Sequence, residues 1–243
     1  IMPSLVGSEM CIRDRKMDGT VIVDVPMLSN GELNYGLSHI KKKLYEENVY
    51  PSEIGFDIMS LATMVYMADT RIERVVHGQD SWTREIELEI PVSNVEIWDS
   101  QIRTVERMLK FLTGDLWKIT LSSRAWQFNN LEEVREKSNK YDEVSLFSGG
   151  MDSLISTINL MENKKNTLLI SHAGEGLTKN AQKNIVNKFD LLYPDVLHTW
   201  LDLWMVFPRD YIPAGGNDNN TRSRSFLFIG YAPVSYTHLT LPT

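Results

Sequence analysis

The stretch 143-EVSLFSGGMDSLIST-157 joins a short apolar run to a helical pattern through two consecutive glycines. Residues 144–147 predict a buried strand, and residues 152–161 predict a helix directly after it. Gly149 and Gly150 lack a Cβ, so the backbone of this turn can approach a bound group closely. The first amide groups of a helix have no partner within it, and the helix dipole favours an anion at that end. The stretch therefore predicts an anion-binding turn.

The polar side chains of the turn suit a phosphate ligand. Ser148 and Ser153 can donate hydroxyl hydrogen bonds to an anion, whereas Asp152 beside a polyphosphate requires Mg²⁺ or a capping role. The turn has neither the Gly-Lys-Ser/Thr ending of a Walker A loop nor the Gly-x-Gly-x-x-Gly pattern of a dinucleotide site. An ordinary strand-to-helix turn with a serine or aspartate cap is the alternative, because these residues are common in turns.

Strands and helices alternate downstream of the turn. Residues 167–171 and 196–203 predict strands, residues 177–192 predict a helix between them, and residues 224–231 predict a last helix. Such alternation is typical of a parallel sheet with right-handed crossovers. We therefore expect an α/β domain in this part of the chain.

Before the turn, the expected strands and helices do not alternate regularly. Their order predicts an α+β domain over residues 16–130. The clearest strand is 83-TREIELEIPV-92, in which apolar and charged residues alternate as in a half-buried strand. Residues 131–142 are mostly charged and are expected to form a linker. The remaining expected elements are strands at 20–25 and 115–122, helices at 37–47, 52–65 and 94–112, and a strand and loop at 71–80. Ser52 is the candidate N-cap of the second helix, and 113-TGD-115 is expected to end the third.

Composition excludes several classes of protein. The 243 residues carry 25 Lys+Arg and 32 Asp+Glu, a formal net charge of −7, which disfavours a nucleic-acid partner. No apolar run reaches the ~18 residues of a membrane-spanning helix, so no membrane partner is expected. The single cysteine, Cys11, allows neither an internal disulfide framework nor a cysteine zinc cage within this chain. A reducing, cytoplasmic compartment is therefore expected.

The motif 148-SGGMDS-153 matches the SGGxDS signature of the PP-loop ATP pyrophosphatase superfamily. Within that superfamily the chain most resembles the 7-cyano-7-deazaguanine synthases, or QueC-like proteins. The stretch 167-TLLISH-172 resembles the second strand of their nucleotide fold. The stretch 221-TRSRSFLF-228 resembles their Pro-x-Arg-Asn-x-x-Phe helix start, with Arg224 at the arginine and Ser225 in place of the asparagine.

The sequence departs from those enzymes in three respects. The loop lies at residue 148 rather than near the N-terminus, 173-AGEGL-177 does not match their Tyr-Gly-Gln-Arg-His stretch, and their four-cysteine zinc site is missing from this sequence. The displaced loop agrees with a second resemblance, to the extra domain of the QueC-like proteins of Qat anti-phage systems, called QatC. The residues that carry it lie at 53–69, 81–92 and 111–117.

The resemblance implies a Rossmann-like domain at 143–233 and an ATP-dependent, carbon–nitrogen bond-forming ligase. A 7-carboxy-7-deazaguanine-like carboxylate would be adenylated with release of pyrophosphate, and a nitrogen nucleophile would then capture it. In a defence system the acceptor would be a protein amine from the same operon. The cofactors implied are ATP and Mg²⁺, with Asp152 as the magnesium ligand. The catalytic residues implied are Ser148, Asp152, Ser153 and Arg224, and the ATP-binding residues are Ser148, Gly149, Gly150, Met151, Asp152, Ser153 and His172.

Two other functions stay open. One is a different PP-loop chemistry, such as amidation or tRNA thiolation, although thiolation generally needs cysteines and residues 16–233 contain none. The other is a nucleotide-binding or scaffold subunit of a defence complex that retains the loop without turnover. An intact SGGMDS motif favours the enzyme over the scaffold.

Several charged residues outside the loop have both a functional and a structural interpretation. Arg224 follows the polar stretch 215-GGNDNNTRS-223, which is a candidate lid, and could neutralise phosphate charge, with Arg222 as the second choice. His172 lies where a parallel strand is expected to end, the edge at which open α/β sheets bind ligands. Asp202 and Asp210 could hold Mg²⁺ or contact the nucleoside. The alternative for each is an ordinary surface or packing role.

A second group of polar and aromatic residues gathers in the N-terminal domain: Asp69, Arg71, Arg74, Trp82 and Arg84. We interpret it as solvated strand edges around one core tryptophan. The lysine run 41-KKK-43 is interpreted as a solvated helix face, because the chain as a whole is acidic.

The two ends, residues 1–15 and 234–243, resemble translated sequencing-adapter read-through. We expect both to be artefacts that pack against nothing. The PP-loop domain would then be truncated at residue 233, with the helix at 224–231 partly uncovered, and this chain would lack turnover.

Overall fold

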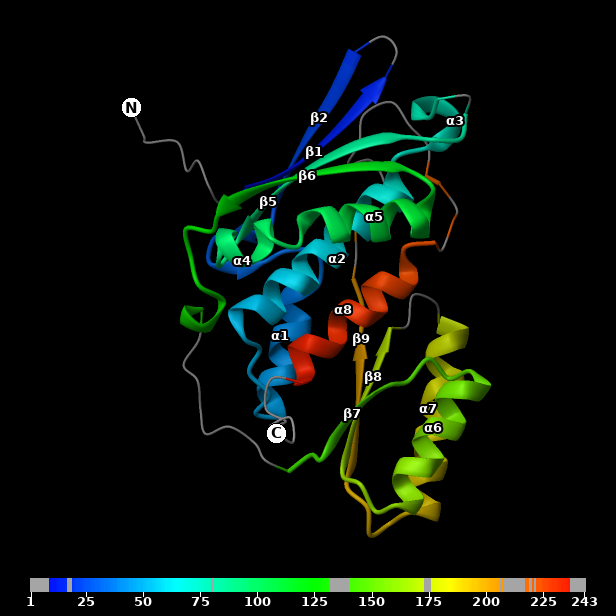
Figure 1. Ribbon diagram of the computed structural model, residues 1–243. Coiled ribbons are helices and arrows are strands. Elements are labelled where there is room, and N and C mark those ends of the chain that lie inside the picture. Colours follow the sequence, from blue (N-terminus) through cyan, green and yellow to red (C-terminus); the bar gives the residue numbers. More distant parts are fainter. Residues whose placement is uncertain are drawn as a thin grey trace.

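A computed structural model describes residues 9–16, 19–79, 81–131, 140–172, 176–205, 207, 217–218, 220 and 222–236. It is an α/β structure in which strands from both halves of the chain form separate sheets (Figure 1). The N-terminal elements are β1 (Glu9–Lys16), β2 (Gly19–Pro26), β3 (Leu28–Ser29), β4 (Glu32–Leu33), α1 (Leu37–Glu46), α2 (Glu53–Arg71), α3 (Arg74–His77), β5 (Glu85–Val92), α4 (Val95–Asp99), α5 (Ile102–Thr113), β6 (Leu116–Ser123) and η1 (Phe128–Asn130).

The N-terminal sheet has the strand order β2-β1-β5-β6. Strand β1 runs antiparallel to both of its neighbours, and β5 runs parallel to β6, with α4 and α5 in the crossover between them. The predicted alternation of β5 is confirmed, since Ile86, Leu88 and Ile90 are buried. The short β3 and β4 form a two-stranded sheet of their own.

The C-terminal sheet contains three parallel strands, β7 (Glu143–Leu146), β8 (Thr167–His172) and β9 (His198–Leu203), in the order of the sequence. The helices α6 (Met151–Glu162) and α7 (Gly176–Leu192) connect them, and α8 (Arg224–Tyr236) follows. The carboxyl ends of the strands face the N-terminal part of the molecule (Figure 1). The predicted α/β alternation of this part is therefore confirmed.

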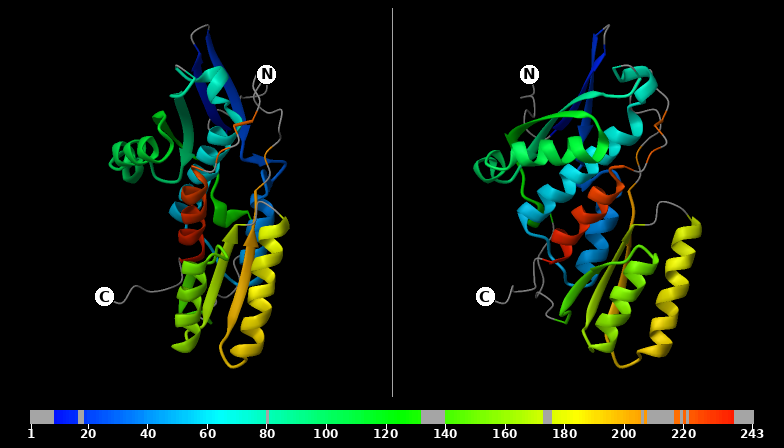
Figure 2. Two further views of the ribbon diagram at one scale, coloured as in Figure 1. Left: turned by 90° about the vertical axis from the view of Figure 1, so that its right-hand side faces the viewer. Right: turned by 45° about the vertical axis from the view of Figure 1, so that its right-hand side comes forward.

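The two faces of this sheet are covered by helices from different parts of the chain (Figure 2). On one face, Leu169 packs with Met161 of α6 and Phe189 of α7. On the other face, Leu168 and Ile170 belong to a larger core that includes α1, α2 and α8. That core continues into the N-terminal sheet, so residues assigned to two domains from the sequence share one hydrophobic core.

Helix α8 packs against α2 on one side and against β7 and β8 on the other. Phe226, Leu227 and Tyr231 are buried, although Ile229 is exposed. The helix was expected to be partly uncovered: α2 covers the face that carries Phe226, Leu227 and Tyr231, whereas Ile229 stays exposed. The sequence interpretation had placed α2 in a separate domain.

Three further expectations need correction. Residues 9–15 do not stand free: they lie in β1, which pairs with β2 and β5. Residues 74–77 form the short helix α3 rather than a strand. The helix expected at 94–112 is divided into α4, which Asn94 caps, and α5, which ends at Gly114 in a left-handed conformation. Within the expected linker, residues 132–139 lie outside the described residues.

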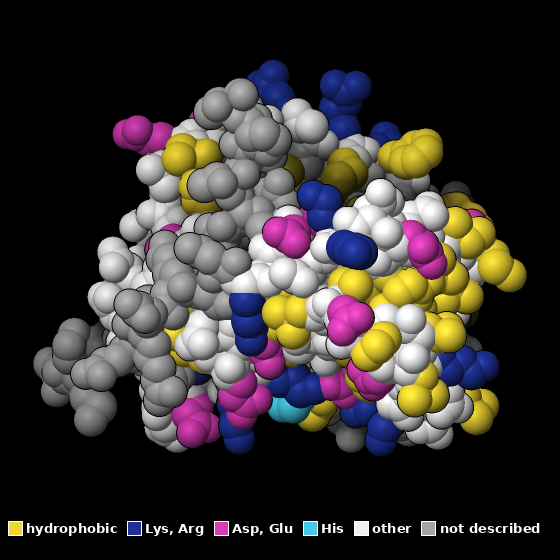
Figure 3. All heavy atoms as spheres, turned by 90° about the horizontal axis from the view of Figure 1, so that it is seen from below, with side chains coloured by type: hydrophobic (Ala, Val, Ile, Leu, Met, Phe, Trp, Pro, Cys, Tyr) yellow, Lys and Arg dark blue, Asp and Glu magenta, His cyan; other side chains and the backbone are white. Residues whose placement is uncertain are grey.

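Charged side chains of both signs are interspersed on the face shown in Figure 3, and hydrophobic side chains gather on the side where α6 and α7 lie. The exposed apolar residues of these two helices include Met151, Ile155, Leu177, Leu191 and Leu192. Among the described residues, no helix is both long and apolar enough to cross a membrane.

Candidate functional site

The turn at residues 148–153 is held by hydrogen bonds between its own residues. Gly149 has a φ of +82°, a left-handed backbone conformation that residues other than glycine rarely adopt. The Ser148 and Ser153 hydroxyls lie 3.0 Å apart, the Ser153 hydroxyl donates to the Gly150 carbonyl at 2.9 Å, and the Gly150 amide donates to Ser148 Oγ at 3.3 Å. Both serines thus lie on one side of the turn, as the motif predicts.

Gln182 of α7 binds the backbone of the turn. No pattern in the sequence predicts this contact. Its amide Nε2 donates to the Ser148 carbonyl at 2.9 Å, and its side chain is fully buried. A Cβ placed on Gly149 would meet Gln182 Cγ at 3.0 Å. A polar residue in the middle of a helix gives no local signal of such a contact, because the contact joins residues 34 positions apart.

Helix α6 begins at Met151 with Gly150 as its N-cap, and no side chain caps it. Its first amides therefore remain available to an anion, and the dipole of a twelve-residue helix favours negative charge there. Asp152 lies exposed in the first turn. One carboxylate beside bound phosphates is a donor set that Mg²⁺ accepts when phosphate oxygens and waters complete it. The described residues contain no group of three or more acidic, histidine or cysteine side chains placed to hold a metal.

A pocket of about 620 Å³ opens beside the turn. Its walls come from the turn, from the first turn of α7 and from α8, and the residues that line it are Ser148, Gly150, Thr178, Arg224, Ser225, Phe228 and Ile229. The structure thus brings Arg224 to the same pocket as the glycine turn, although 76 positions separate it from Ser148. Thr178, Phe228 and Ile229 are pocket residues that sequence analysis missed.

His172 ends β8, as expected, but it does not line this pocket. Its ring is only 3% exposed and lies about 6 Å from the rings of Tyr66 and Tyr231. Burial, together with the nearby positive charge of Arg224, lowers the pKa of His172 to about 4. The neutral ring therefore has a packing role, which is the structural alternative that the sequence left open.

Asp202 lies on β9 between two lysines. Lys43 of α1 and Lys179 of α7 both form ion pairs with its carboxylate, and Lys43 Nζ also donates to the Asp202 carbonyl at 3.1 Å. Burial and the charge of Lys179 lower the pKa of Lys43. Lys43 is thus a tertiary contact rather than part of a solvated face, and Asp202 is already paired. Asp210 lies outside the described residues.

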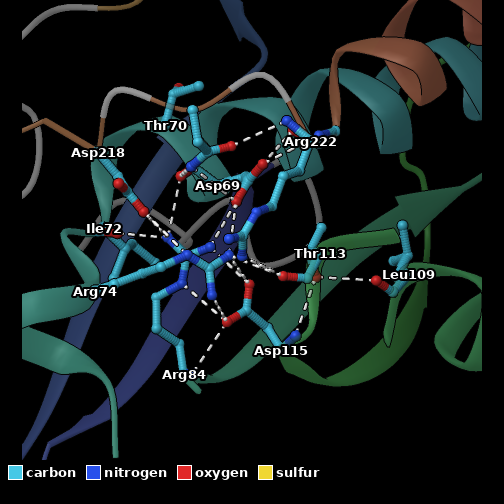
Figure 4. Close-up of polar contacts among 12 residues, drawn as sticks. Asp69, Thr70, Ile72, Arg74, Arg84, Leu109, Thr113, Asp115, Asp218 and Arg222 are labelled. Atoms are coloured by element: carbon cyan, nitrogen blue, oxygen red, sulfur yellow. Dashed lines mark hydrogen bonds and ion pairs between the residues drawn. The ribbon is translucent and has the colours of Figure 1, made fainter. Parts of the chain in front are cut away.

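A buried ion network occupies the junction between the N-terminal sheet and the segment before α8 (Figure 4). Arg84 and Asp69 are fully buried, and Arg84 Nη2 contacts Asp69 Oδ1 at 2.5 Å and Asp115 Oδ2 at 2.6 Å. Arg74 donates to both oxygens of Asp115, at 2.7 and 2.8 Å. Burial alone would raise the pKa of Asp115, but Arg84 and Arg74 hold it below its usual value. The interpretation of these residues as solvated strand edges is therefore wrong.

The segment before α8 is attached to this network. Asp218 forms an ion pair with Arg74 at 3.1 Å, and Asn220 donates to the Asp69 carbonyl at 3.0 Å. The Arg222 guanidinium donates to the Thr113 carbonyl at 3.0 Å and lies 4.9 Å from the centre of the Trp82 ring. Trp82 is 59% exposed and not the expected core residue. The described residues of the candidate lid thus bind the N-terminal part rather than the pocket.

Comparisons with protein-family models, with curated proteins and with solved structures find no match to this chain.

Proposed function

We propose that this protein binds ATP in the pocket between the glycine turn and α8, within a Rossmann-like domain, and uses it to adenylate a carboxylate. One observation carries the proposal: Ser148, Gly150 and Arg224 line the same pocket of about 620 Å³. Two sets of anion-binding groups, one on the turn and one on α8, therefore converge from distant parts of the sequence.

The turn suits the pyrophosphate end of ATP. The uncapped amides of α6, the Ser148 and Ser153 hydroxyls and the absence of a Cβ at Gly149 and Gly150 favour a close anion. Arg224 supplies a positive charge that can pair with phosphate oxygens, and its planar fork matches their geometry. Thr178 and Ser225 add hydroxyl groups to the same walls.

The opposite wall suits an aromatic ring. Phe228 and Ile229 line the pocket, and Ile229 is 56% exposed. Stacking and apolar contact with a nucleobase or a deazaguanine ring would cover these side chains. The substrate proposed from the resemblance, a 7-carboxy-7-deazaguanine-like acid, contains such a ring.

The proposed reaction has two steps, adenylation of the carboxylate and capture of the adenylate. A carboxylate oxygen attacks the α-phosphorus, the bond from that phosphorus to the bridging oxygen breaks, and pyrophosphate leaves toward the turn. A nitrogen nucleophile then attacks the acyl carbon, loses a proton and displaces AMP. The residues of this chain orient the phosphates and balance their negative charge, which are the main requirements of such transfers. Mg²⁺, held by Asp152 and the phosphates, would neutralise further charge when bound.

Calorimetric titration of the chain with ATP and Mg²⁺ tests the proposal. Ser148→Ala and Arg224→Ala should each weaken binding about tenfold or more, since each removes a hydrogen bond to a charged group. Ser156→Ala is the matched control, because Ser156 is an exposed serine on α6 that does not line the pocket. Equal binding by all four proteins would refute the site.

Exchange of labelled pyrophosphate into ATP tests the chemical step, measured in a longer homologue that carries the same SGGMDS motif, because this chain is expected to lack turnover. Exchange that depends on a deazaguanine acid and is lost in Asp152→Ala supports the adenylating enzyme. ATP binding without exchange would instead favour the nucleotide-binding subunit.

A further inference from the structure

Arg224 of the pocket directly follows a residue, Ser223, that does not line the pocket. Arg224 is the first residue of α8, and Ser223 precedes it directly. The Ser223 carbonyl accepts the first-turn hydrogen bond of the helix from the Leu227 amide at 3.0 Å. The position of Ser223 therefore determines where α8 starts and where the Arg224 side chain begins.

Ser223 is held by one carboxylate of the N-terminal half. Both its amide and its hydroxyl donate to Asp69 Oδ2, at 3.1 and 2.7 Å. Ser223 and Asp69 are each fully buried and lie 154 positions apart in the sequence. A buried hydrogen bond to a charged acceptor is stronger than a neutral one, so this pair is a firm attachment.

The two oxygens of Asp69 have different partners. Oδ1 accepts from Arg84 Nη2 at 2.5 Å and from Arg74 Nη2 at 3.3 Å (Figure 4). Oδ2 accepts from Ser223. The arginines are themselves held by Asp115. Asp69 therefore cannot turn away from Ser223 without leaving a buried guanidinium short of its counter-charge, which is costly.

We propose that Asp69 is a positioning residue for the nucleotide pocket: by holding Ser223 it sets the start of α8 and the place at which Arg224 meets the bound phosphates. This inference rests on the proposed nucleotide site. A long, flexible arginine contributes to binding only when its backbone is fixed, because otherwise the bound state must order it. The N-terminal half is thus part of the binding machinery without lining the pocket.

The test uses Ser223→Ala, which removes the hydroxyl but leaves every charge of the network in place. Titration with inorganic pyrophosphate and Mg²⁺ should show binding weakened about tenfold, the factor expected from one lost charge-assisted hydrogen bond. Thr63→Ala is the matched control. Thr63 is a fully buried residue of α2 whose hydroxyl donates to the Met59 carbonyl at 2.6 Å within the same helix. It should bind pyrophosphate as the wild type does.

A double-mutant cycle separates positioning from a general loss of stability. In an Arg224→Ala background, Ser223→Ala should weaken pyrophosphate binding no further, because its effect passes through the arginine. An equal, additive weakening in both backgrounds would overturn the inference, as would unchanged binding by Ser223→Ala alone.

Asp69→Asn provides a second variant, since an amide has one acceptor oxygen and cannot serve both Ser223 and the arginines. Amide hydrogen exchange at residues 227–230, whose amides make the first hydrogen bonds of α8, should then be faster than in the wild type, with β8 unchanged. Unchanged hydrogen exchange in both Ser223→Ala and Asp69→Asn would show that the hydrogen bonds between Ser223 and Asp69 do not fix the start of α8. A wild-type chain that binds no pyrophosphate refutes the proposed function, and the role assigned to Asp69 falls with it.

Discussion

At the scale of single residues, both the backbone conformation and the neighbouring side chain of Gln182 restrict position 149 to glycine. Its φ of +82° excludes most side chains, and a Cβ there would also meet Gln182 Cγ at 3.0 Å. Gly149→Ala should therefore destabilise the protein by about 1–2 kcal/mol and weaken ATP binding. Gly31→Ala is the control, because Gly31 has a φ of +81° with nothing within 4 Å of its Cβ position. Urea unfolding should show a smaller loss for the control, and equal losses would mean that the contact with Gln182 contributes nothing.

His172 makes a prediction about pH at the same scale. Burial lowers the pKa of His172 to about 4 in the folded protein, whereas the unfolded value is 6.5. Between these values the unfolded chain binds a proton that the folded chain does not, so stability falls as the pH decreases from 6.5 toward 4. From pH 7 to pH 5 this histidine should remove about 2 kcal/mol. Urea titrations of wild type and His172→Gln at both pH values measure it, and identical losses in the two proteins would contradict the prediction.

At the scale of elements, α2 and α8 meet at small residues. A Cβ on Gly230 of α8 would lie 2.6 Å from the Ala62 Cβ of α2, which is too close for two methyl groups. Alanine is ordinarily the better helix former by about 0.5–1 kcal/mol. Gly230→Ala should nevertheless destabilise the protein by about 1–3 kcal/mol through overpacking.

Ala62→Gly in the same protein tests this explanation, because it removes the atom that the new methyl group would strike. The double variant should regain most of the stability lost by Gly230→Ala, as followed by thermal unfolding. A double variant less stable than either single variant would show that the helices do not meet at these two residues.

At the scale of the whole molecule, the core shared by the N-terminal sheet and the C-terminal sheet indicates that the two halves of the chain fold together. Leu168, Ile170, Leu201 and Leu203 of the parallel sheet lie in the same core as α1, α2 and α8. A fragment of residues 140–236 would lack α1 and α2 and would expose the part of this face that they cover. We expect it to lack a cooperative unfolding transition and to bind a hydrophobic dye, whereas the full chain should unfold in one transition. A fragment that unfolds cooperatively would support the separate domains expected from the sequence.

The local features of this protein could be predicted from the sequence by itself. The half-buried β5, the strand–turn–helix at residues 143–162, the cap at Ser52 and the end of α5 at Gly114 all agree with the structure. Each depends on side-chain periodicity, on a capping oxygen or on the backbone freedom of glycine, and all of these act within a few residues of the chain.

Only the tertiary structure decided which residues meet across the chain. The partners of Asp69 come from residues 74, 84, 220 and 223, and α8 finds its cover in α2. An isolated aspartate or arginine in the sequence reads as solvated, because burying a charge is costly without a partner. Whether that partner exists depends on long-range packing, which periodicity and composition do not encode. The same holds for Arg224, which lines the pocket as the first residue of α8 and directly follows Ser223, a residue bound to Asp69.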